Sequence, residues 1–179
     1  MLRPYNCGVP AADLSGKRVL VLGAETEIGR SVTSAVAEAG ASVAAVAATG
    51  DAEAAFAVQR LARRLASGER KVIAQAIDAT NEAAVRVMVR QVSKELGGLY
   101  AVVFCADLGE DTPQAVDFAS RYANREFART GGGTFIAAAG AGTPVGLDEA
   151  PAEYASMVVR RAEDVAAVVQ TVVEALADA

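Results

Sequence analysis

The feature that most constrains this chain is a regular alternation of short apolar runs with longer amphipathic segments. The first run covers residues 18–22 and is followed by Gly23. Short runs that are apolar without alternation are typical of strands buried on both faces of a sheet. Residues 28–39 then place apolar side chains at helical spacing and are followed by Gly40, a residue that often ends helices. The pattern predicts a strand, a tight turn and a helix.

The same unit recurs along the chain. Further strands are predicted at residues 42–47, 71–76, 99–105, 134–138 and 155–159, and further helices at residues 52–66, 82–96, 113–129 and 162–177. Asp51 and Asn81 stand where two of these helices begin and are expected to cap them. Strands that alternate with helices are joined by right-handed crossovers, which favours parallel pairing. The predicted fold class is α/β: a Rossmann-type, doubly wound, mostly parallel sheet of five to six strands with helices on both faces.

The length of 179 residues suits one domain with a substantial core. Residues 1–16 are punctuated by prolines and glycines and show no period, so they are predicted to form an N-terminal arm. Residues 17–179 are predicted to form a single Rossmann-like domain.

The charge balance and the apolar pattern restrict the partners of this chain. A formal net charge of −5 argues against a phosphate backbone or an anionic membrane surface as a binding partner. The N-terminal residues show no signal-peptide pattern, and no apolar run reaches the roughly 18 residues of a membrane span. We therefore expect a cytoplasmic protein that binds neither nucleic acid nor membranes.

The chain contains no histidine, and its two cysteines, Cys7 and Cys105, are far apart in the sequence. A metal site would need carboxylates alone, so none is predicted. Both cysteines are expected to be free thiols or small core residues. Any proton transfer would have to come from a carboxylate, tyrosine, lysine or cysteine.

A glycine-containing turn at residues 22–29 separates the first strand from the first helix. Such a turn lets the backbone approach a diphosphate at the helix N-terminus. The turn resembles the T-G-x-x-x-G-x-G motif of the short-chain dehydrogenase/reductase family, with Gly23, Ile28 and Gly29 retained. Glu27 replaces the middle glycine, and Glu25 also stands in the turn.

Two carboxylates in this turn are expected to repel a diphosphate. At about 5 Å and an effective dielectric constant of about 20, each pair of charges costs roughly 3 kcal/mol before screening. The glycines are therefore interpreted first as packing residues and second as cofactor-binding residues. The second strand ends at Ala47 and Ala48, without the acidic or basic residue that the family places there for the adenosine ribose. Asp51, a few positions on, could substitute for it, but is interpreted first as a helix cap.

Two further segments carry the resemblance. Residues 76–84 resemble the family's D-V-T-D segment through Asp78, and residues 97–107 resemble its G-G-L-D-V-L-V-N-N-A-G segment, of whose last four residues only Ala106 matches. The resemblance implies five cofactor-binding positions, which we interpret as vestigial: Gly23, Ile28, Gly29, Asp78 and Ala106.

The resemblance also locates the family's catalytic groups, which are a tyrosine, a lysine four residues later and an upstream serine. Residues 131–142 resemble the strand that delivers the serine, but Ala138 and Ala139 stand at its position. Tyr154 is the only tyrosine near the tyrosine position, and Val158 replaces the lysine. We assign no catalytic residue, keep Tyr154 only as a weak candidate, and expect it to open a short strand.

Three hypotheses follow. The first is a non-catalytic subunit or scaffold that needs no cofactor and associates with a protein partner, as a homo-oligomer or a hetero-oligomer with a related chain such as an active oxidoreductase. The second is an oxidoreductase with an altered site that uses NAD or NADP. The third is a sensor that binds a small ligand in the cleft near Gly23, Ala47, Asp78 and Ala106.

Overall fold

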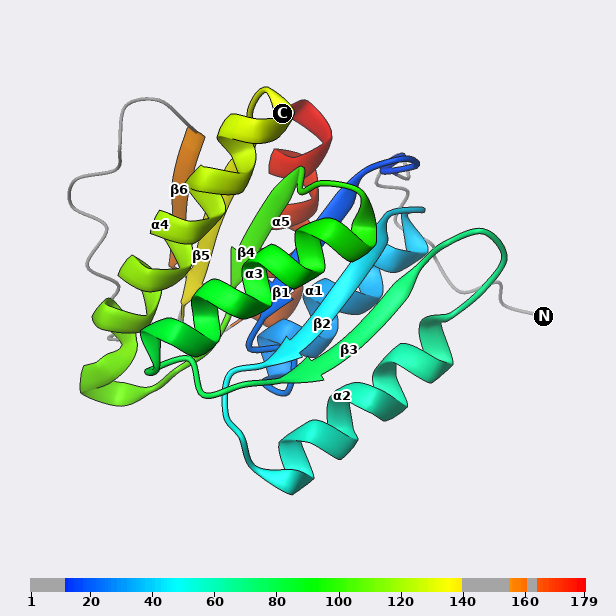
Figure 1. Cartoon of the computed structure of the whole chain (residues 1–179). Helices are drawn as coiled ribbons and strands as arrows, with labels where there is room; N and C mark the ends of the chain where they lie inside the picture. The colour runs from blue at the N-terminus through cyan, green and yellow to red at the C-terminus, as the bar shows by residue number, and fades with distance from the viewer. Residues whose placement is uncertain (1–11, 140–154, 161–163) are drawn as a thin grey trace.

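Six strands form a single parallel sheet at the centre of the molecule (Figure 1). The computed structural model describes residues 12–139, 155–160 and 164–179. The sheet order is β3-β2-β1-β4-β5-β6, and all five pairings are parallel. The strands are β1 (Arg18–Leu22), β2 (Ser42–Ala47), β3 (Val72–Ala76), β4 (Ala101–Phe104), β5 (Thr134–Ala139) and β6 (Ala155–Arg160). The predicted fold class is confirmed.

Helices cover both faces of this sheet. They are α1 (Glu27–Glu38), α2 (Ala52–Leu65), α3 (Glu82–Leu96), α4 (Thr112–Thr130) and α5 (Val165–Asp178), with a short 3-10 turn η1 (Gly109–Asp111) before α4. Helices α1, α2 and α5 pack on one face, whereas α3 and α4 pack on the other (Figure 1). In β1, Val19 and Val21 belong to the core beneath α1, α2 and α5. Leu20 and Leu22 belong to the core beneath α3 and α4. Because both faces are buried, the strand has no polar alternation.

The predicted elements are all present, and their ends shift by up to three residues because of local caps. Helix α1 begins at Glu27 rather than at residue 28, since Thr26 caps it by accepting from the N–H of Gly29. Helix α5 begins at Val165 rather than at residue 162, since the carboxylate of Asp164 accepts from two amides of its first turn. Strand β4 is shorter than the predicted 99–105 at both ends.

Ordered packing begins before Lys17, where the sequence predicted the domain to start. Leu14 is fully buried in the core beside α1, and its N–H donates to the carbonyl of Ala39 at 2.8 Å. Residues 12–16 thus pack against the domain. The remainder of the predicted arm, with Cys7, lies outside the described residues.

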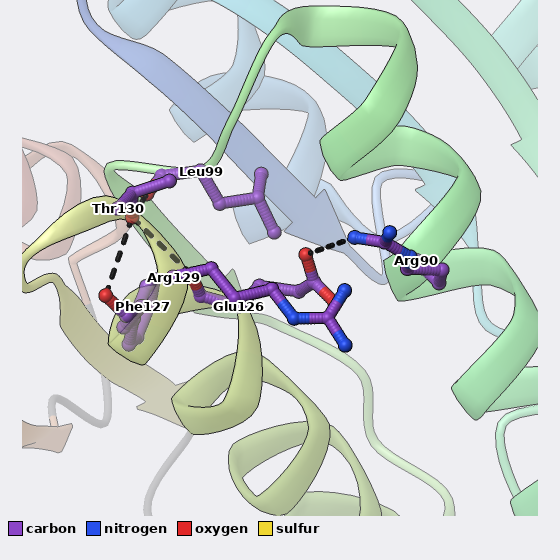
Figure 2. A network of polar contacts seen from close by, with 6 residues as sticks. All are labelled: Arg90, Leu99, Glu126, Phe127, Arg129 and Thr130. Carbon is purple, nitrogen blue, oxygen red and sulfur yellow. Dashed lines mark hydrogen bonds and ion pairs between the residues drawn. The ribbon is translucent and has the colours of Figure 1, made fainter.

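A buried carboxylate joins α3 and α4, which cover the same face of the sheet (Figure 2). Glu126 of α4 is only 6% exposed, and it pairs with Arg90 of α3 at 3.1 Å and with Arg129 of α4 at 3.4 Å. The hydroxyl of Thr130 donates to the carbonyl of Leu99 at 3.3 Å. These contacts fix the last turn of α4 beside α3 and the start of β4.

The order of the strands creates a switch point at the carboxyl edge of the sheet. Strands β1 and β4 are neighbours, but the chain leaves β1 toward β2 and leaves β4 toward β5. The helices that follow these two strands, α1 and α4, therefore lie on opposite faces. In open parallel sheets this switch point is where ligands bind, beyond the carboxyl ends of the strands.

Candidate functional site

The glycines of the turn after β1 are required by close backbone packing. Gly23 has φ +96°, and a Cβ there would lie 2.8 Å from the Cα of Ala106, the second residue after β4. A Cβ on Gly29 would overlap the Gly23 carbonyl group, 2.7 Å from its carbon atom. The structure therefore brings Gly23, Gly29 and Ala106 together, and packing alone accounts for both glycines.

Most amides of this turn already have partners within the chain. The N–H groups of Gly23 and Ala24 donate to the carbonyl of Val46 at 2.8 and 3.0 Å. The hydroxyl of Thr26 donates to the Gly23 carbonyl at 2.8 Å and accepts from the N–H of Gly29 at 3.0 Å. These bonds hold the turn against the end of β2 in one conformation.

Two amides at the start of α1 have no such partner built into the helix. Glu27 and Ile28 are its first two residues, so no carbonyl lies one turn earlier to accept from their N–H groups. The helix dipole adds a partial positive charge at the same end. The side chain of Ile28 packs against the core beside α1, which leaves its backbone N–H as the group that an anion could contact. These amides suit the oxygens of an anion.

The carboxylate of Glu27 is solvated rather than held in the turn. Glu27 is exposed, and it lines a groove of about 910 Å³ between α1 and α5, together with Ser31, Val169 and Glu174. Water and salt screen an exposed charge strongly. The expected repulsion of a diphosphate by two carboxylates in the turn is therefore weakened at Glu27.

The carboxylate of Glu25 is directed to the end of β2. Both of its oxygens lie 3.2 Å from the N–H of Ala48, the first residue after that strand. Glu25 is half-buried, and this burial raises its pKa, while hydrogen bonds from its own N–H and from Ala48 act in the opposite direction. In the sequence, Glu25 stands in the diphosphate turn and the end of β2 has no acid; the fold brings the carboxylate of Glu25 to that end.

Cys105 follows β4 and lies next to this turn. Its thiol is buried and free, and burial raises its pKa strongly, with a smaller contribution from the negative charge of Glu25. The thiol therefore stays protonated at neutral pH and does not serve as a nucleophile. The prediction of a free, structural cysteine is confirmed for Cys105.

Asp78 lies at the same edge of the sheet but apart from the turn. It follows β3, which is separated from β1 by β2. Its carboxylate accepts from the N–H and the hydroxyl of Thr80 at 2.9 and 2.6 Å, and these bonds lower its pKa. Within the described part of the chain, no recorded hydrogen bond joins Asp78 to Gly23 or Ala106. The side chain of Asp78 therefore stabilises the turn of residues 78–80 and remains exposed to solvent.

The positions of the family's catalytic groups contain no proton-transfer group among the described residues. Ala138 is buried in β5, and Ala139 ends that strand, so neither position has a hydroxyl. Residues 155–160, which include Ser156 and Val158, form β6 beside β5. The predicted short strand is confirmed. Tyr154 itself lies outside the described residues.

The described residues contain neither a cluster of metal ligands nor a helix that could span a membrane. Within residues 12–139, 155–160 and 164–179, no three cysteine or acidic side chains gather as metal ligands would. Of the helices described, none combines the length and the apolar character needed to cross a bilayer.

The raised pKa of Glu25 predicts that the stability of the protein depends on pH. Because burial raises its pKa, the folded protein holds this proton more tightly than the unfolded chain. The free energy of unfolding therefore loses a contribution as pH rises from the unfolded pKa through the folded pKa. Glu25→Gln should match the wild type below that interval and be the more stable protein above it. Urea unfolding between about pH 4 and about pH 8 measures the difference.

Glu27→Gln, which removes one negative charge from the same turn, is the control for Glu25→Gln. A stability difference between Glu25→Gln and wild type that does not change with pH would contradict this account of Glu25.

Known proteins resemble this chain in both sequence and fold. A sequence model of the short chain dehydrogenase family matches residues 17–141. A short-chain type dehydrogenase/reductase from Mycobacterium marinum is 34% identical, with a TM-score of 0.64 over 73% of this chain and 58% of that one. A short chain dehydrogenase from Burkholderia cenocepacia J2315, solved in complex with NADP, is 29% identical, with a TM-score of 0.60 over 72% and 57%. The chain thus spans less than two thirds of the length of these proteins. No curated protein matches it.

Proposed function

Because the chain belongs to the short-chain dehydrogenase family, we propose that residues 17–141 form the nicotinamide-nucleotide-binding part of an oxidoreductase. The observation that carries the proposal is the start of α1. There, the N–H groups of Glu27 and Ile28 are left for an anion beside the switch point between β1 and β4. The carboxylates of Glu25 and Glu27, which led us to expect a damaged site, are held at the end of β2 and solvated, respectively.

The residues present fit a dinucleotide at this edge. The amides of Glu27 and Ile28 would hold the diphosphate. The exposed carboxylate of Asp78 would lie on the adenine side, as the family resemblance implies. When bound, the dinucleotide supplies hydride transfer. The Burkholderia relative was solved with NADP, which supports a ligand of this class.

A second candidate function is a non-catalytic subunit that associates with a related chain. The observation in its favour is the pair Ala138 and Ala139, which gives β5 no hydroxyl at the position where the family's serine would polarise a substrate oxygen. Such a subunit would be part of a homo-oligomer or a hetero-oligomer with an active oxidoreductase. Nucleotide binding without turnover by the isolated chain would favour this candidate or a ligand sensor.

Calorimetric titration of the full chain with NADH tests the proposed function. We expect a dissociation constant below about 100 μM, which corresponds to roughly −5.5 kcal/mol. Glu27→Pro should weaken binding about tenfold relative to Glu27→Ala, since both remove the carboxylate but only proline removes the N–H. A hydrogen bond to a charged group is worth about 1.5 kcal/mol or more.

The fold should accept this proline. Position 27 is the first residue of α1, where proline is favoured, and Thr26 before it is extended at φ −72° and ψ 162°. Circular dichroism of Glu27→Pro confirms that α1 is kept. Equal affinities of Glu27→Pro and Glu27→Ala would overturn the assignment of this amide, and the absence of NADH binding by the wild type would overturn the proposed function.

A further inference from the structure

Glu25 supplies an acid at the end of β2, where the sequence of that strand has none. In Rossmann-type folds the adenosine ribose of a bound dinucleotide lies over this strand end, and an acidic residue there hydrogen-bonds its 2′-hydroxyl. Here the strand ends in Ala47 and Ala48, whose side chains can accept no hydrogen bond. The carboxylate of Glu25 comes from the turn after β1 and reaches the N–H of Ala48 with both oxygens at 3.2 Å.

The carboxylate keeps acceptor capacity after these contacts. An ionised carboxylate offers about four lone-pair sites. The hydrogen bonds recorded for Glu25 come from two amides, its own N–H and that of Ala48. The N–H of Ala48, shared between the two oxygens, and the N–H of Glu25 occupy three of these sites, and the fourth can accept from a ribose hydroxyl. Since the two amides and the half-buried position fix the side chain, its geometry is set before a ligand arrives.

The charges around Glu25 would not accommodate a 2′-phosphate. No salt bridge of Glu25 is recorded within the described residues. Among the residues that the structure describes, the cation in contact with it is Arg30, whose guanidinium donates to the main-chain oxygen of Glu25 at 3.5 Å rather than to the carboxylate. A phosphate dianion placed beside this carboxylate would meet a like charge in a partly dehydrated site.

We propose that Glu25 makes the carboxyl edge of the sheet selective for nucleotides whose adenosine ribose has a free 2′-hydroxyl, so that this chain binds NAD in preference to NADP. The inference rests on the proposed function. The preferred nucleotide would thus differ from the one in the Burkholderia relative, which was solved with NADP. The position of Glu25 in the sequence does not indicate this selectivity, because Glu25 lies in the turn after β1 and not at the end of β2.

Titration of the full chain with NADH and NADPH measures this selectivity. The wild type should bind NADH about 10- to 100-fold more tightly than NADPH. Glu25→Gln keeps an acceptor for the hydroxyl but removes the charge, so the affinity for NADPH should rise and the ratio should approach one. Arg30→Ala is the matched control, and it should leave the ratio of the wild type unchanged.

Two shorter probes isolate the ribose position. The wild type should bind 5′-AMP more tightly than adenosine 2′,5′-bisphosphate, and Glu25→Gln should remove the difference. Equal affinities of the wild type for NADH and NADPH, or an unchanged ratio in Glu25→Gln, would overturn the selectivity while leaving the proposed function intact. A wild type that binds none of the four nucleotides would overturn both.

Discussion

Gly29→Ala is expected to lower the free energy of unfolding by about 3 kcal/mol or more. The added Cβ would overlap the Gly23 carbonyl group and lie 2.9 Å from the Cα of Ala24. These are backbone atoms at the junction of β1 and α1, so no side-chain rotation can relieve the overlap. Helix α1 would have to move away from the sheet, with loss of packing on that face. Urea unfolding followed by circular dichroism gives the change.

Gly50→Ala is the control for this substitution. A Cβ on Gly50 would meet nothing within 4 Å, and its φ lies outside the left-handed region. Its effect should stay within about 0.5 kcal/mol. If both substitutions changed the free energy of unfolding equally little, the backbone of the turn would accommodate the added Cβ, and packing would not require Gly29.

Phe127→Ala is also expected to lower the free energy of unfolding strongly, by about 3–5 kcal/mol. The Phe127 side chain is fully buried at the end of α4 and packs directly over Gly133, where a Cβ would lie 2.5 Å from the ring's Cε1 atom. Gly133→Ala should therefore destabilise the wild type by roughly 1–3 kcal/mol through overpacking. In the Phe127→Ala background the space is open, and Gly133→Ala should cost little.

A double-mutant cycle on these two positions measures the contact. The coupling free energy should exceed about 1 kcal/mol. The same cycle with Phe104→Ala is the control, because Phe104 is opposite Ala137 in the sheet, four residues beyond Gly133. Additive effects of Phe127→Ala and Gly133→Ala would contradict the packing of the ring on this glycine.

Much of the fold follows from interactions between residues close in sequence. Asp51 and Asn81 were expected to cap helices from their positions alone, and their side chains accept from the amides of Ala54 and Ala84 at 3.2 and 3.1 Å. Gly97 ends α3 with φ +80°. Caps and apolar runs depend on short stretches of chain, and so they can be interpreted without the tertiary structure.

The candidate site was predicted only in part. The sequence located the turn of Gly23 and Gly29 and the alanines of β5, and the structure places them at the carboxyl edge as expected. It did not show that Leu14 is part of the core, because a single leucine between prolines and glycines has no period. Nor did it separate the roles of Glu25 and Glu27, which stand two residues apart in one turn.

What the sequence determined by itself is the order of strands and helices along the chain, the burial of both sheet faces and the caps Asp51 and Asn81, since each depends on residue spacing over a short stretch of chain. Only the tertiary structure decided where the two acids of the turn point. Glu25 reaches Ala48 because hydrogen bonds from Gly23 and Ala24 to Val46 draw the turn against the end of β2. That approach joins residues more than twenty positions apart, and no local pattern encodes it.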